Sequence, residues 1–168
     1  MTKKEMQGYL KRNDILIEGN TATWNCHITG KIQGTYIGTF RFKCFLTPTE
    51  TLAASRDYRE LLGPNATLAF KNEDDLAFAL AQLRYRIVSA PPFWTSAVGV
   101  NSYQGDIADA EVIHMVLEAA IAAQLKYNAQ LEKAKEDALK RAKAAAERLL
   151  AQKEGQVELE EEESEGSA

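Results

Sequence analysis

The stretches TATWNCHIT (residues 21–29) and TYIGTFRFKCFL (residues 35–46) decide the fold, because in both of them apolar and polar side chains alternate. In the first stretch Trp24, Cys26 and Ile28 share one face. The apolar face of the second stretch consists of Tyr36, Phe40, Phe42, Cys44 and Leu46. A period of two with aromatic and β-branched residues is typical of strands that bury one face. The glycine-bounded loop between them predicts an antiparallel hairpin.

A third strand is predicted in front of this hairpin. The segment ILIE (residues 15–18) is apolar, and the tight-turn pair Gly19-Asn20 follows it. The sequence therefore predicts a three-stranded antiparallel meander with one apolar face.

The two cysteines can be placed from the register of this meander. A hairpin that turns near Ile32 puts Cys26 opposite a residue near Gly38, and Cys44 opposite a residue near Asn20. The thiols would then lie roughly 20 Å apart at about 3.3 Å per residue, whereas a disulfide needs Cα atoms within about 7 Å. We interpret both cysteines as small buried apolar residues; a different register would change this.

A helix is predicted directly after the meander. Thr47, Pro48 and Glu50 form a capping box with proline at the first helical position. The helix is expected to end at Gly63-Pro64.

A second helix is expected to begin near Asn72 or earlier and to end before Pro91. Its predicted core stripe is Leu76, Leu80, Leu83 and Ile87.

A third helix is predicted to begin at Asp106 or Asp109 and to dock its first half on the body. Beyond Tyr127 the chain contains almost only strong helix formers. One narrow apolar stripe continues there through Leu131, Ala138, Ala142, Ala145 and Leu149. This stripe is compatible with a docking or coiled-coil helix and equally with a solvated spacer, and Gly155 is expected to end the helix.

The acidity of the chain is concentrated after that glycine. The net charge is −4, but residues 155–168 alone carry six glutamates and no base, which leaves +2 on the rest. Such a segment has almost nothing to bury and is expected to be disordered.

The predicted fold class is α+β, with one domain and its appendages. A flexible arm spans residues 1–13 and an α+β body spans residues 14–127. A projecting charged helix follows over residues 128–154, and the acidic tail occupies residues 155–168.

The segment SAPPFWTS (residues 89–96) places two prolines and two large aromatic residues between helical patterns. The stiff pair Pro91-Pro92 fixes the direction in which Phe93 and Trp94 point. We predict an anchor, buried either in a pocket of this chain or in a pocket of a partner. These four residues, together with Leu131 and Leu149, are the predicted interaction residues.

No catalytic, cofactor-binding or metal site is predicted, and the expectation is that the protein is not an enzyme. His114 has Glu111 and Glu118 at helical spacing, but an ion network on the surface explains this arrangement. His27 lies on the polar face of a strand. No phosphate-binding loop and no nucleophile motif occurs in the sequence.

Charge and hydropathy limit the partners that we expect. The basic residues are too few for typical nucleic-acid binding. No apolar run approaches the roughly 20 residues that span a bilayer, and no secretory signal is recognisable. We expect a soluble protein that is made and kept in a cytoplasm and binds other proteins, with self-association left open.

The middle of the chain, residues 34–121, resembles small structural and morphogenesis proteins of tailed bacteriophages. This resemblance is carried by four sequence segments, GTFRFKCFLTPTE, YRELLG, LAFALAQLRYRIVSAPPFW and GDIADAEVI. It implies a non-enzymatic part of a capsid, connector or tail, or an assembly protein.

The expected function is therefore structural or assembly-related contact between proteins, in a component of the virion. One alternative is an assembly chaperone that is not retained in the particle. Another is a nucleic-acid-binding module that stacks bases on the aromatic sheet face.

Overall fold

The computed structural model describes residues 15–64, 71–95 and 107–167. It has an α+β fold, as expected, and the chain divides into two compact units, Met1–Tyr127 and Asn128–Ala168. The division falls at the residue where the sequence places the end of the body. The arm predicted over residues 1–13 lies outside the described residues.

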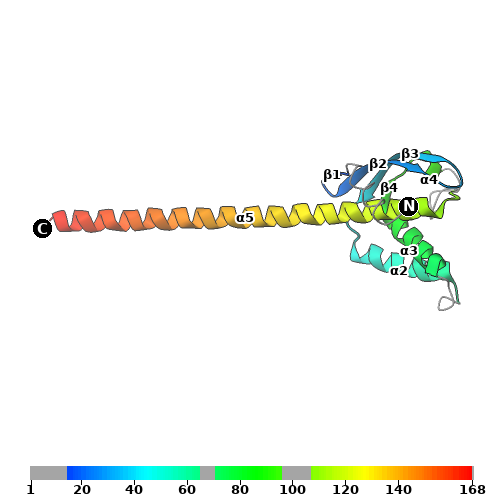
Figure 1. The fold of residues 1–168 in the computed structure, drawn as a ribbon. Coiled ribbons are helices and arrows are strands. Elements are labelled where there is room, and N and C mark those ends of the chain that lie inside the picture. Colours follow the sequence, from blue (N-terminus) through cyan, green and yellow to red (C-terminus); the bar gives the residue numbers. More distant parts are fainter. Residues whose placement is uncertain (1–14, 65–70, 96–106, 168) are drawn as a thin grey trace. The chain divides into compact units, whose positions relative to one another are not determined.

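The first unit contains an antiparallel sheet in the order β1-β2-β3-β4 (Figure 1). Its strands are β1 (Leu16–Glu18), β2 (Thr21–Thr29), β3 (Thr35–Lys43) and β4 (Ile87–Ser89). The hairpin register is the predicted one, because Cys26 pairs with Gly38 and the Cys44 N–H donates to the Asn20 carbonyl. The meander is therefore confirmed, and β4 extends it at the β3 edge.

Two helices follow the predicted boundaries closely. In α2 (Pro48–Leu62), Thr47 and Glu50 form the full capping box, and Gly63 ends the helix with a φ of 73°. Helix α3 (Lys71–Arg86) ends one residue before Ile87. The prediction that Ile87 belongs to the helical stripe is wrong, since Ile87 begins β4 and pairs with Phe42. The β-branched pair Ile87-Val88 suits this strand, and the nearby Pro91 prevents a longer helix.

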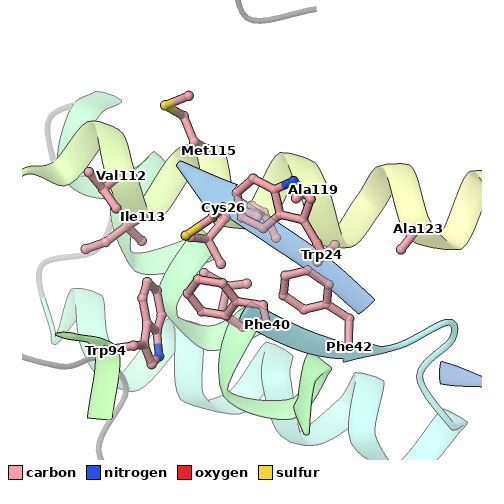
Figure 2. Packing of buried hydrophobic residues seen from close by; sticks show 14 of the residues in the cluster. Trp24, Cys26, Phe40, Phe42, Trp94, Val112, Ile113, Met115, Ala119 and Ala123 are labelled. Atoms are coloured by element: carbon pink, nitrogen blue, oxygen red, sulfur yellow. The ribbon is translucent and has the colours of Figure 1, made fainter. Parts of the chain in front are cut away.

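The core lies between the sheet, α3 and the first turns of α5 (Ala110–Gly166). Trp24, Phe40 and Phe42 are fully buried and their rings stack on one another (Figure 2). Figure 2 shows Val112, Ile113 and the small Ala119 and Ala123 of α5 in the same cluster. The buried residues of α5 cover more than half of its circumference, which is typical of a helix inside a core.

Helix α5 continues to Gly166, so the predicted helix end at Gly155 is wrong. Residues 155–166, expected to be disordered, are helical, and all of them are exposed. A single glycine costs only about 1 kcal/mol against alanine inside a helix. The leucine and glutamates around it are good helix formers, so local propensity continues the helix. None of the described helices is long and apolar enough to cross a membrane.

Candidate interaction surfaces

The predicted Phe93–Trp94 anchor lies within its own chain. The short helix α4 (Pro92–Thr95) begins after Pro91, whose carbonyl accepts the Trp94 N–H at 2.9 Å. Trp94 is 5% exposed and meets Phe40 edge to face, with the ring centroids 5.4 Å apart. The structure thus selects the internal pocket among the two alternatives.

The other residues of the anchor lie on the same sheet. Phe93 is half-buried and packs edge to face on Tyr36 and Phe40. Pro91 is buried directly on Gly38 of β3, where an added Cβ would meet the Pro91 Cβ at 2.2 Å. Glycine at this position lets the proline lie on the strand. Pro92 alone is exposed and open to contact.

A buried carboxylate that the sequence analysis did not recognise joins the β2–β3 loop to the start of α5. Asp109 accepts the backbone N–H groups of Lys31, Ile32 and Gln33 at 2.9, 2.9 and 3.1 Å. It also accepts the Tyr36 hydroxyl at 2.8 Å. Three successive N–H groups around one carboxylate form an anion nest made by the chain for its own side chain.

This arrangement sets the electrostatics of the junction. Burial acts to raise the pKa of Asp109, but the loop N–H groups and the Tyr36 hydroxyl together hold that pKa below its ordinary value. Gly30 is required nearby, since an added Cβ would lie 2.4 Å from the Asp109 Oδ2. The sequence predicted Asp109 only as a helix cap. Its backbone does play that part, because its carbonyl accepts the Val112 N–H.

A second buried carboxylate, also missed, links α2 to α3. Asp57 is 2% exposed and accepts the Tyr85 hydroxyl at 2.6 Å and the Arg84 Nη1 at 2.9 Å. The hydrogen bond to Asp57 raises the pKa of Tyr85, with burial acting in the same direction. Both links are structural ties between elements rather than accessible sites.

The predicted histidine–glutamate group lines a pocket of about 310 Å³. His114, Glu111 and Glu118 of α5 line it together with Asp75 of α3, which the sequence analysis did not include. Glu111 forms an ion pair with Lys31 at 2.8 Å, and Glu118 also has an interaction partner. Within the described part of the chain, no group of three or more His, Cys, Asp or Glu side chains could hold a metal ion.

The cysteines are placed as predicted, free and buried. Burial raises the pKa of Cys26 to about 11, against the effect of nearby backbone hydrogen bonds. Burial also raises the pKa of Cys44. Both thiols therefore stay protonated near neutral pH and are poor nucleophiles.

The second unit differs from all of these sites, because every residue over positions 128–167 is exposed. Leu131 is 40% exposed and Leu149 is 61% exposed. Further exposed aliphatic side chains on the same helix are Leu139, Leu150, Val157 and Leu159. The predicted interaction residues therefore fall into two groups. The anchor, residues 91–94, lies at the sheet of the first unit, and Leu131 and Leu149 lie in the second unit.

Comparison with known proteins finds no matching family model, no similar curated protein and no similar solved structure.

Proposed function

We propose that this protein is a non-enzymatic structural or assembly protein that acts through protein–protein contacts, in the particle of a tailed bacteriophage. The observation that carries this proposal is the exposed helix of the second unit. The sequence of residues 34–121 supports the phage assignment, because it resembles structural and morphogenesis proteins of tailed phages.

The helix of the second unit is unusual in what it exposes. Six aliphatic side chains are between 40% and 63% exposed in it, over a segment of about 60 Å at about 1.5 Å per residue. Single exposed leucines are ordinary in proteins. A series of them on one helix suits the helix-in-groove and coiled-coil modes, which take apolar side chains at intervals of three and four residues.

The test is to measure the mass of the purified protein alone and in mixtures with the products of genes adjacent to its own. We expect a complex that the double variant Leu131→Glu/Leu149→Glu weakens by about 2 kcal/mol or more, the range for interface anchors. Ala129→Glu/Ala151→Glu is the matched control, because it adds the same charge on the opposite side of the helix. Equal effects of both variants, or no complex at all, contradict the proposal.

The assembly chaperone remains the first alternative. The acidic residues 158–165 would suit a protein that leaves before the particle is complete. Presence of the protein in purified particles decides for the virion component, and absence decides for the chaperone.

In the described part of the first unit, the aromatic sheet face that nucleic-acid binding would use is buried. The alternative requires an exposed aromatic sheet face, but Trp24, Phe40 and Phe42 are 0% exposed and Tyr36 is 6% exposed. Base stacking needs free ring faces, which these side chains do not offer. A labelled oligonucleotide should therefore show no salt-dependent shift with this protein.

A further inference from the structure

The helix of the second unit is divided into two blocks of opposite charge. Residues 133–153 carry seven bases and three acids, whereas residues 154–165 carry seven glutamates and no base. All of these side chains are exposed. A short ion pair between Lys135 and Glu132 at 2.8 Å engages one of the bases locally. The remaining charge forms a dipole along the helix, positive first and negative last.

An apolar face runs through both blocks. At about 100° per residue, five of the six large aliphatic side chains fall within an arc of about 100°. They are Leu131, Leu139, Leu149, Leu150 and Val157. An arc of this width is typical of a helix that buries one face against a partner.

We propose that a second copy of this chain covers this face, with the two α5 segments antiparallel. The inference rests on the proposed function, since it takes the exposed helix as an interaction element, and it names the partner. The charge pattern chooses the occupant, because the first part of the positive block, residues 133–142, needs a negative surface, and residues 154–165 of the same helix supply one of similar length. Antiparallel pairing brings these two segments together at both ends of the pair.

One register agrees with the apolar and the charged residues together. Placing Leu139 against Val157 of the second copy also places Ala146 against Leu150. In this register Lys133 and Lys135 lie at the level of Glu163 and Glu161 of the second copy along the helix axis, so the oppositely charged segments overlap. The central leucine pair Leu149-Leu150 falls close to the two-fold axis, where the contact is symmetric.

The parallel alternative is disfavoured by the same charges. An in-register parallel pair would place the seven glutamates of one copy beside the seven of the other. The basic blocks would also face each other. Like charges in this position suppress association, whereas opposite charges fix the orientation of paired helices.

The test uses the full-length protein and two charge-reversal variants, Glu161→Lys/Glu163→Lys and Lys133→Glu/Lys135→Glu. Glutamate and lysine are comparable helix formers, so the helix itself should persist. Sedimentation velocity and circular dichroism are measured for each variant alone and for the equimolar mixture, at about 50 mM and about 500 mM salt, since added salt screens exposed charges.

We expect a wild-type dimer at low salt whose dissociation constant rises about tenfold or more at high salt. Each variant alone should dissociate about tenfold or more easily than the wild type, because like charges then meet in both pairs. The mixture should restore a heterodimer of wild-type affinity, since opposite charges then meet in both pairs. The single variants report the orientation, because a parallel in-register pair places like charges at these positions in the wild type and in each variant, and the variants would then dissociate no more easily than the wild type.

Two results overturn the inference. One is a wild-type protein that is monomeric at all concentrations tested, and the other is a mixture that fails to restore the dimer. If the monomer still binds a product of a neighbouring gene through Leu131 and Leu149, only the self-pairing is wrong. If it binds none, the proposed function is wrong as well.

Discussion

One helix, α5, is stabilised in two different ways in the two units. In the first unit its residues Val112, Val116, Ala119 and Ala120 are 0% exposed among the side chains of the sheet and α3. In the second unit no residue over positions 128–167 is even half-buried. Packing stabilises most helices in proteins, and isolated ones are marginal in water. The first segment therefore belongs to a core, and the second depends on helix propensity and ion pairs and, in our proposal, on a partner.

Truncation of the anchor should give the largest loss in the free energy of unfolding. It should also distinguish the packed first unit from the exposed second unit. Trp94→Ala removes a buried side chain against Phe40 and should lower the free energy of unfolding by about 3–5 kcal/mol. Leu149→Ala in the second unit should change it by less than about 0.5 kcal/mol in the monomeric protein, since that side chain is exposed. Denaturant unfolding followed by fluorescence measures both.

The conservative variant Trp94→Phe controls for volume and should cost clearly less than Trp94→Ala. Equal stability of Trp94→Ala and the wild type would mean that the anchor does not hold the first unit together.

The Asp109 junction predicts an acid dependence that only the first unit carries. The pKa of Asp109 is below its ordinary value of 3.8 in the folded chain. Its contribution to stability is therefore fully present above the unfolded pKa and is lost as the pH falls through the folded pKa. Asp109→Asn should lower the thermal midpoint at pH 7 and flatten its dependence on pH below about 4.

Thermal unfolding between pH 2 and pH 7 for both proteins measures this difference. Tyr36→Phe is a useful companion variant, since it removes one donor and leaves the three loop N–H groups. A pH dependence of Asp109→Asn that equals that of the wild type would show that the nest does not depend on the charge.

Local patterns in the sequence predicted the sheet and its register well. The alternation around Trp24 and Phe40 and the glycines of the turn are local signals, and the capping box of Thr47 involves residues three apart. Each of these can be recognised within one short segment of chain. The fold class and the pairing of Cys26 with Gly38 followed from them.

The contacts that were missed all depend on residues that are distant along the chain, whereas the helix beyond Gly155 continues through local propensity. Asp109 accepts from a loop 76 to 78 residues earlier, and Asp57 accepts from Tyr85, 28 residues later. Strand β4 is only three residues long, and it exists because it pairs with β3. The spacing within one segment does not encode such contacts. The close contact of Pro91 with Gly38 likewise follows only from the three-dimensional structure.

Replacement of Gly155 sharpens the comparison within the second unit. An added Cβ at this residue meets no atom within 4 Å, so Gly155→Ala should fit without strain. It should stabilise the helix locally by about 1 kcal/mol, which slows amide hydrogen exchange on both sides of residue 155 by about fivefold. Unchanged exchange would mean that the chain is not helical beyond Gly155 in solution.

Removal of residues 155–168 should have the smallest effect on the first unit. These residues bury nothing in the described structure, so the thermal midpoint of the aromatic core should shift by less than about 2 °C, the effect of an ordinary surface change. The same deletion removes six of the seven glutamates of the negative block and should abolish the antiparallel dimer. Near-ultraviolet circular dichroism reports the core, and sedimentation reports association. High salt removes the mass-action contribution of the dimer to the midpoint. A large drop that persists at high salt would mean that the acidic segment packs on the folded first unit, and the contrast between a packed and an exposed region of α5 would then fail.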